Sequence, residues 1–271
     1  AVLALGAVSL AACGSKHFDK PMTLGGTEVS AAVLEHGREA YIHNCRQCHG
    51  DNGDGNGPAA IWLFPKPRNF SAGLFKIQST PPGSLPSDED LFESITRGLG
   101  GSSMPGFTYL SVNERRDVVQ YVKYLTAQVG PDAKRVNKFE EAKNSEPLAQ
   151  PISVPPEPPL TLDSITRGQE LFTRLQCMTC HGDGPTAPTL KDNFGVPVLP
   201  RDFNTGAFRG GATGRDLYLR IATGLAGTPM PPFTDETVKP DERWDLVHFV
   251  QSLRRKDIEV NDILAPEDGR I

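Results

Sequence analysis

The stretches Cys45-Arg46-Gln47-Cys48-His49 and Cys177-Met178-Thr179-Cys180-His181 decide how this chain folds. Each holds two cysteines separated by two residues and followed at once by a histidine. Two thiols at this spacing lie about one helical turn apart, so both project from the same side of the chain. The chain has five cysteines, and the two stretches use all of them except Cys13.

The pattern Cys-x-x-Cys-His is the attachment signature of c-type haem. The two thiols add across the two vinyl groups of one porphyrin, and the adjacent histidine then lies under the iron as its proximal ligand. The sequence therefore predicts two covalently bound haems c. The predicted attachment cysteines and proximal histidines are Cys45, Cys48 and His49 for one haem, and Cys177, Cys180 and His181 for the other.

Three other uses of paired cysteines are open to an exported protein. The four cysteines could form two disulfides, they could bind zinc, or each pair could be a thioredoxin-like redox site. Paired zinc ligands usually lie closer in sequence than Cys48 and Cys177 do. None of these alternatives explains a histidine directly after both pairs, so haem attachment is the favoured interpretation.

The composition fits a chain that builds its core around an added group. Gly (27) and Pro (24) together approach a fifth of the 271 residues, and the hydrophobic fraction is 38%. Such a chain is rich in loops and poor in apolar core, and a covalently held macrocycle would supply what the side chains lack. The net charge of −5, without a dense basic block, argues against nucleic acid as a partner.

The haem motifs belong to a longer internal repeat. Pro-Arg-Asn-Phe at 67–70 matches Pro-Arg-Asp-Phe at 200–203, and the pattern Gly-Leu-x-Gly-x-x-Met-Pro at 98–105 returns at 224–231. The offset between matching residues stays nearly constant, so insertions between the copies are small. Two copies of one domain explain a repeat of this length better than a solenoid does.

Each copy predicts three helices: one that leads into the haem motif, a middle helix, and a last helix with an apolar i, i+1, i+4, i+7 stripe. The middle helices are expected to be capped by Ser87 and Thr213. Gly37 and Gly168, each four residues before an aromatic residue, predict a close crossing of the first and last helices. No strand pattern is convincing. Two segments are expected to be loops: 50–86 and 182–212.

The N-terminal stretch predicts export and a lipid anchor. Residues 1–12 are uncharged, too few for a bilayer span of about twenty residues, and typical of the apolar region of a secretory signal. Leu10-Ala11-Ala12-Cys13 resembles a bacterial lipobox, so we expect lipidation of Cys13. An ordinary signal peptide with an incidental cysteine is the alternative. Residues 14–30 are expected to form a polar tether to the membrane.

The repeat and a proline-rich run set the expected domain boundaries. Residues 144–160 contain six prolines, a composition that favours an extended linker. The expected order is a lipoprotein signal segment at 1–13, the tether at 14–30, a first domain at 31–143, the linker at 144–160, and a second domain with a C-terminal tail at 161–271.

The ligand on the open face of each iron decides what a haem protein does. Met104 and Met230 occupy equivalent positions in the repeat, each followed by proline in a Gly/Pro-rich loop. Such a loop can hold a thioether toward the iron, although a methionine there can also simply fill a gap. Recurrence beside both haem motifs favours ligation. His36, His43 and His248 are interpreted as surface or packing residues.

Arg68 and Arg201 also recur at one position of the repeat. An arginine at this position can form a charge-assisted hydrogen bond with a haem propionate. The alternative is a solvated side chain in a loop. We include both arginines among the candidate cofactor-binding residues.

With these features the sequence resembles the class I c-type cytochromes, as a tandem of two that covers about residues 30–128 and 160–256. The resemblance implies an all-α fold, in which two domains of a few helices and long loops each wrap around one covalent haem. The motif around each methionine is most similar to the cytochrome domains attached to haem-copper oxidases and related membrane complexes. This sequence departs from them because no later run is apolar enough to cross a membrane.

We therefore expect a dihaem c-type cytochrome, lipid-anchored on the periplasmic side of a bacterial membrane. It would pass single electrons between redox protein partners, a respiratory membrane complex above all, and it would take no small-molecule substrate. His/Met ligation fills both axial positions of each iron and leaves none for a substrate, so an electron carrier is expected and not an enzyme. One alternative is a haem enzyme of the dihaem peroxidase or thiosulfate-oxidising type. The other is a passive cytochrome subunit of a larger complex.

Overall fold

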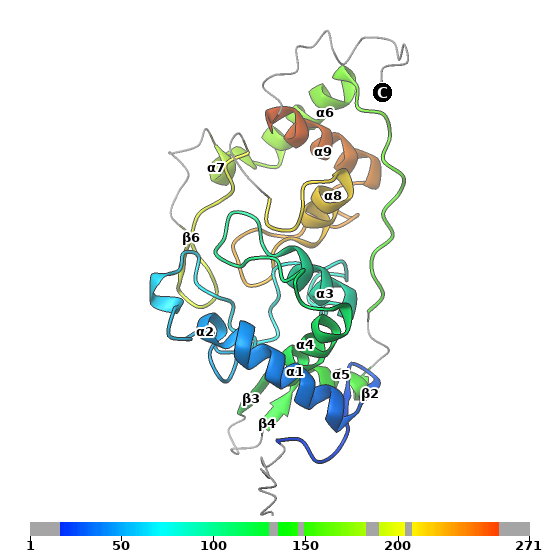
Figure 1. The fold of residues 1–271 in the computed structure, drawn as a ribbon. Helices are drawn as coiled ribbons and strands as arrows, with labels where there is room; N and C mark the ends of the chain where they lie inside the picture. The colour runs from blue at the N-terminus through cyan, green and yellow to red at the C-terminus, as the bar shows by residue number, and fades with distance from the viewer. Residues whose placement is uncertain (1–16, 130–134, 146–148, 183–189, 204–207, 255–271) are drawn as a thin grey trace, which may run out of the picture.

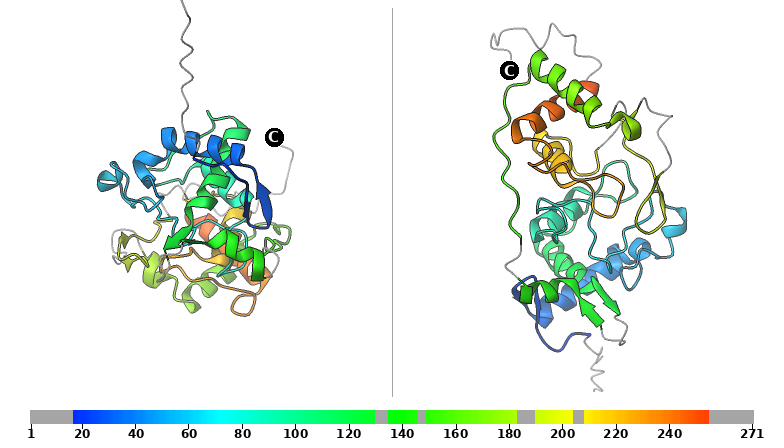
Figure 2. Two further views of the ribbon diagram at one scale, coloured as in Figure 1. Left: turned by 90° about the horizontal axis from the view of Figure 1, so that it is seen from below. Right: turned by 180° about the vertical axis from the view of Figure 1, so that it is seen from behind.

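The computed structural model describes residues 17–129, 135–145, 149–182, 190–203 and 208–254. Cys13, its lipobox and the C-terminal tail lie outside these residues. The described chain forms an N-terminal half, up to residue 145, and a C-terminal half, from residue 161. The two halves lie one below the other in Figure 1, and the extended residues 149–160 run along one side from the first to the second (Figures 1 and 2).

The helices of the second half repeat those of the first. The N-terminal half contains α1 (Ala31–Asn44), α2 (Arg46–His49), the 3-10 helix η1 (Ala60–Trp62), α3 (Asp88–Arg97), α4 (Val112–Leu125) and α5 (Lys138–Ser145). The C-terminal half contains α6 (Leu162–Arg174), α7 (Met178–His181), α8 (Gly214–Thr223) and α9 (Pro240–Arg254). The leading, middle and last helices predicted for each copy are therefore confirmed. Among the described residues, none of the helices is long and apolar enough to span a membrane.

In the part of the chain that the structure describes, six short strands correct the expectation that the fold is purely helical. They pair as three antiparallel sheets: β1 (Met22–Leu24) with β2 (Thr27–Val29), β3 (Ala127–Val129) with β4 (Arg135–Asn137), and β5 (Leu190–Lys191) with β6 (Pro197–Val198). Strands of two or three residues are too short to show an alternating pattern, so they could not be predicted from the sequence.

The β1–β2 hairpin lies within the segment that was expected to be a polar tether. From residue 17 onward this segment instead packs on the N-terminal core, where Phe18, Leu24 and Val29 are all buried. Gly25 and Gly26, both at positive φ, allow the tight turn that brings the second strand back along the first. The apolar residues of this stretch were too widely spaced to suggest a packed element, and only the turn brings them together.

The first and last helices of each half cross at a glycine. A Cβ atom at Gly37 would lie 2.1 Å from the carbonyl oxygen of Asp117, and one at Gly168 would lie 2.0 Å from that of Asp245. No side chain fits at either crossing without a shift of the helices. The predicted close crossings are thus confirmed, and an aromatic residue of the last helix also lies against each glycine: Tyr121 of α4 at Gly37 and Phe249 of α9 at Gly168.

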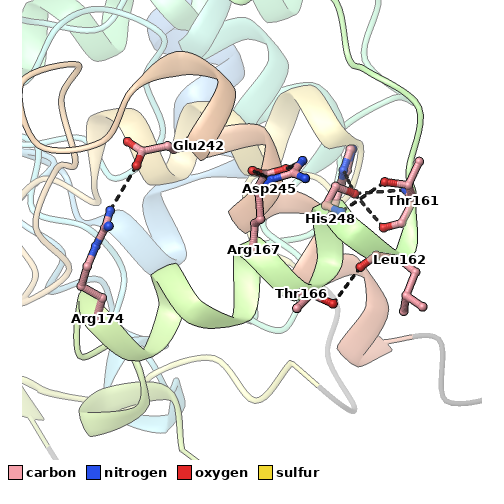
Figure 3. Close-up of polar contacts among 9 residues, drawn as sticks. Thr161, Leu162, Thr166, Arg167, Arg174, Glu242, Asp245 and His248 are labelled. Atoms are coloured by element: carbon pink, nitrogen blue, oxygen red, sulfur yellow. Dashed lines mark hydrogen bonds and ion pairs between the residues drawn. The ribbon is translucent and has the colours of Figure 1, made fainter.

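Polar contacts also join α6 to α9 (Figure 3). Arg167 donates two hydrogen bonds of 2.8 Å to the carboxylate of Asp245. His248 is fully buried, with Nδ1 2.8 Å from Oγ of Ser164. Its interpretation as a packing residue is therefore confirmed.

The middle helices α3 and α8 begin with the predicted caps. Ser87 accepts a hydrogen bond from the backbone N–H of Asp90, whose side chain accepts one from the backbone N–H of Ser87. Thr213 and Asp216 form the same reciprocal pair at the start of α8. The two helices face each other where the halves meet (Figure 1).

The sequence left open whether the halves are docked, and the structure shows that they are. Arg220 of α8 donates to the carbonyl oxygens of Lys76, at 3.3 Å, and of Gln78. Arg97 of α3 lies 3.5 Å from the carboxylate of Asp216. These bonds join loop 70–80 and α3 of the first half to α8 of the second.

Candidate haem sites

Both Cys-x-x-Cys-His stretches adopt the same short helical turn, α2 in the first half and α7 in the second. In each, the N–H groups of the second cysteine and of the histidine donate to the carbonyl oxygen of the first cysteine. The distances are 3.1 and 2.9 Å in the first stretch, and 3.2 and 2.9 Å in the second. This turn places the two thiols and the histidine beside one another, as haem attachment requires.

All four motif cysteines are free thiols. Burial raises the pKa of Cys45 to about 12 and that of Cys177 to about 11, so both remain protonated near neutral pH. The disulfides considered as an alternative are not formed. No cluster of three or more His, Cys, Asp or Glu side chains able to hold a metal ion occurs within the described residues.

A backbone carbonyl orients each predicted proximal histidine. Nδ1 of His49 lies 3.1 Å from the carbonyl oxygen of Arg68, and Nδ1 of His181 lies 3.1 Å from that of Arg201. Because a carbonyl only accepts, the proton of each ring belongs on Nδ1. Burial lowers the pKa of both histidines, which favours the neutral ring. The lone pair of Nε2 is then available to a metal.

Two phenylalanine rings stack behind each of these histidines. The ring centroids of His49 and Phe70 are 4.5 Å apart, and those of Phe70 and Phe75 are 5.8 Å apart. The second half repeats the stack with spacings of 4.5 and 5.9 Å, in residues His181, Phe203 and Phe208. The outer phenylalanines were missed from sequence. The signal was there, since the repeat that begins at Pro67 and Pro200 continues as far as these two rings.

The loops that carry Met104 and Met230 have matching backbone geometry. The carbonyl oxygen of each methionine accepts a hydrogen bond from a leucine N–H five residues earlier, at 3.1 Å in the first half and 3.2 Å in the second. The N–H of each methionine donates at 3.3 Å to a hydroxyl two residues earlier. Both methionines are partly buried. The structure thus gives the two predicted distal ligands equivalent positions.

Arg68 and Arg201 are not solvated loop residues. All three guanidinium nitrogens of Arg68 are buried without a hydrogen-bond partner, as is Nε of Arg201. Burial lowers the pKa of Arg68. A buried, unpaired cation costs several kcal/mol, which an anion at this position would offset. The propionates of a haem are such anions, so the residues around each motif fit haem c.

A helical fold that presents a neutral histidine beside two free, partly buried thiols on one short turn is that of a c-type cytochrome. The profile of the family described as cytochrome C oxidase, cbb3-type, subunit III matches residues 32–122 and 163–250. These two segments make up more than half of the chain, and the chain belongs to this family of c-type cytochromes. Membership implies covalently bound haem c and a role in electron transfer.

Two curated relatives are cytochrome bc1 complex cytochrome c subunits. The protein from Corynebacterium diphtheriae is 22% identical over 226 residues, which cover 82% of this chain and 67% of the relative. The one from Corynebacterium efficiens is 24% identical over 226 residues, 82% of this chain and 64% of the relative. The chain thus spans about two thirds of their length.

A solved structure shares the fold over nearly its whole length. It is a chain of the Kuenenia stuttgartiensis reducing HAO-like protein complex Kustc0457/Kustc0458, with a TM-score of 0.72 and 38% identity. The match covers 82% of this chain and 96% of that chain.

Proposed function

We propose that this chain is a dihaem electron carrier that holds one haem c in each half. The observation that carries the proposal is the duplication of a complete site. Each half has two thiols on a short helical turn, a histidine oriented by a loop carbonyl, and an arginine in that same loop whose Nε is buried without a partner. Bound haem supplies a one-electron iron couple, and the chain supplies its attachment, its ligands and its surroundings.

Met104 and Met230 are proposed as the distal ligands of the two irons. Their loops have equivalent geometry, and each methionine is followed by a proline that restrains its backbone. A thioether ligand raises the reduction potential of a haem and leaves no position for oxygen or peroxide. Both sites would then carry electrons and perform no further chemistry, in contrast to the haem-enzyme alternative.

The proposed partner is a respiratory membrane complex. The support comes from the relatives, two of which are bc1 complex subunits, and from a solved chain that belongs to a redox complex.

We further propose that the chain is held on the periplasmic side of a bacterial membrane by a lipid on Cys13. This anchor is testable, since Cys13→Ser should release the haem-loaded protein into the soluble fraction. Retention of that variant in membranes stripped of partner proteins would refute the anchor.

The number of haems is tested by a pyridine haemochrome assay on the full-length protein. The parent should contain two haems per chain. The double variants Cys45→Ser/Cys48→Ser and Cys177→Ser/Cys180→Ser should each contain one, because each removes one attachment site and leaves the other. One haem in the parent chain would refute the dihaem proposal.

The distal ligands are tested by spectroelectrochemical titration, with carbon monoxide added to the reduced protein. The parent should show two waves and no carbon monoxide binding. Met104→Ala and Met230→Ala should each lower one midpoint potential and open one iron to carbon monoxide. Met178→Ala, at a motif methionine that is 45% exposed, is the matched control and should change neither property. A parent protein that binds carbon monoxide would favour the enzyme alternative.

A further inference from the structure

A second pair of cations accompanies the two buried arginines. Lys76 and Arg209 follow Arg68 and Arg201 by the same number of residues, so both belong to the repeat. Each half therefore contributes two basic side chains from one loop. Nε of Arg209 is buried without a hydrogen-bond partner, as are the guanidinium nitrogens of Arg68.

Each arginine reaches into the opposite half. The guanidinium of Arg201 lies over Gly101, where an added Cβ would come within 2.5 Å of Nη2. The guanidinium of Arg68 lies beside Gly227, where an added Cβ would be 2.9 Å from Nη1. Both glycines stand three residues before the predicted distal methionine of their own half. The exchange is reciprocal, since each arginine contacts the methionine loop of the other half.

Other contacts show that Arg68 interacts with both halves, through its side chain with the second and through its backbone with the first. Its guanidinium lies 5.4 Å from the ring centroid of Phe194 in the second half. Asp192, also of the second half, acts on it as an opposite charge. Meanwhile its backbone carbonyl holds His49 in the first half. One residue thus connects the proximal ligand of one half to the surface of the other.

The four basic side chains interact electrostatically across the boundary between the halves. Burial lowers the pKa of Lys76 to about 8, with the positive charges of Arg68 and Arg209 acting in the same direction. Burial and the charge of Arg201 lower the pKa of Arg209. Asp192 is the described carboxylate that opposes these effects on Arg68 and Lys76. We define Arg68, Lys76, Arg201 and Arg209 as the cation cluster, and the carboxylate of Asp192 offsets only part of its positive charge.

We propose that these four cations form one anion site shared by the two halves, and that it takes the propionate carboxylates of both haems. The inference rests on the proposed function, because it requires one haem in each half. Two haems bring two pairs of carboxylates, which match the four cations in number and charge. Gly101 and Gly227 make room for the crossing guanidinium groups. The consequence is that the charge state of one half influences the haem of the other.

The test is the effect of a single arginine on both midpoint potentials of the haem-loaded, full-length protein. Arg201→Gln should lower both, because a carboxylate that loses its cation stabilises the oxidised iron. The expected change in each reduction equilibrium is about tenfold, or about 59 mV for a one-electron couple. Arg201→Lys keeps the charge and should keep most of both potentials. Arg174→Gln, an exposed arginine of the same half, is the matched control and should change neither.

A shift of one midpoint alone in both Arg201→Gln and Arg68→Gln would overturn the inference, because each arginine would then act on a single haem. Unchanged potentials would overturn it as well. The haem count separates this failure from that of the proposed function. Two haems per chain with uncoupled potentials refute only the shared site, whereas one haem per chain in the parent refutes the proposed function itself.

A second readout follows the docking of the halves. Small-angle scattering of the haem-loaded double variant Arg68→Gln/Arg201→Gln should give a larger radius of gyration than the parent, and protease should cut residues 149–160 faster. The control Arg174→Gln/Arg215→Gln removes two exposed arginines outside the cluster and should leave both properties unchanged. If the Arg68→Gln/Arg201→Gln variant has the same radius of gyration and the same resistance to protease as the parent, the cations do not help to hold the halves together.

Discussion

The crossing of α6 and α9 at Gly168 allows a prediction about stability with a definite sign. In an exposed helix, replacing glycine by alanine stabilises the fold by about 0.5–1 kcal/mol, since alanine is the better helix former. At Gly168 the new methyl group would lie 2.0 Å from the carbonyl oxygen of Asp245 and 2.8 Å from Cβ of Phe249. Ordinary contacts exceed 3 Å, so the helices must separate by about 1 Å or more. Overpacking of this kind costs about 1–3 kcal/mol, and occasionally more.

We therefore expect Gly168→Ala to lower the free energy of unfolding of the C-terminal half by about 2 kcal/mol. The measurement is urea unfolding of the haem-loaded protein, followed by far-UV circular dichroism and by haem absorbance. Gln169→Ala, at the exposed neighbouring position of α6, is the matched control and should change the midpoint little. Gly37→Ala should have a similar effect on the N-terminal half, where the contact is 2.1 Å. A Gly168→Ala protein as stable as the parent would refute the reasoning.

Four further substitutions test other parts of the fold. Ser87→Ala and Thr213→Ala should each cost about 1 kcal/mol in urea unfolding, because each removes the helix cap of a reciprocal pair; no loss in either variant would contradict the role of the caps. Arg220→Ala removes the donors to two carbonyl oxygens of the first half and should speed proteolysis of residues 149–160, whereas the exposed Arg215→Ala should not. Arg243→Ala should cost about 3 kcal/mol in the same unfolding assay, because this fully buried guanidinium donates to Tyr218, Phe233, Asp235 and Val238; a loss below about 1 kcal/mol would show that water replaces those bonds.

Local chemistry could be predicted well from the sequence. The spacing of Cys45, Cys48 and His49 predicts a haem-attachment motif from five residues alone. This is possible because the backbone turn that the motif needs is formed within those residues. The caps of α3 and α8 were predictable for the same reason, since a hydroxyl and a carboxylate three residues apart satisfy each other. The glycines at the helix crossings were found because the repeat placed both of them at the same distance from an aromatic residue.

Elements that depend on distant contacts were missed. The hairpin of β1 and β2 has no periodic pattern of its own, and its apolar residues gain their partners from the N-terminal core. The tether expected there was wrong for the residues that the structure describes. The outer rings of the phenylalanine stacks were overlooked because ring stacking joins residues that no short motif groups together.

The sequence by itself determined the class of protein, and it indicated the internal repeat and the candidate residues for haem attachment and iron ligation. These properties depend on the order and spacing of residues along the chain. Only the tertiary structure decided that the halves are docked and that Arg68 and Arg201 cross the boundary between them. The sequence around an arginine in a loop is the same whether its side chain contacts water, its own domain or a neighbouring domain. Its partner is chosen by how two separately folded surfaces meet, and that choice leaves no pattern in either stretch of sequence.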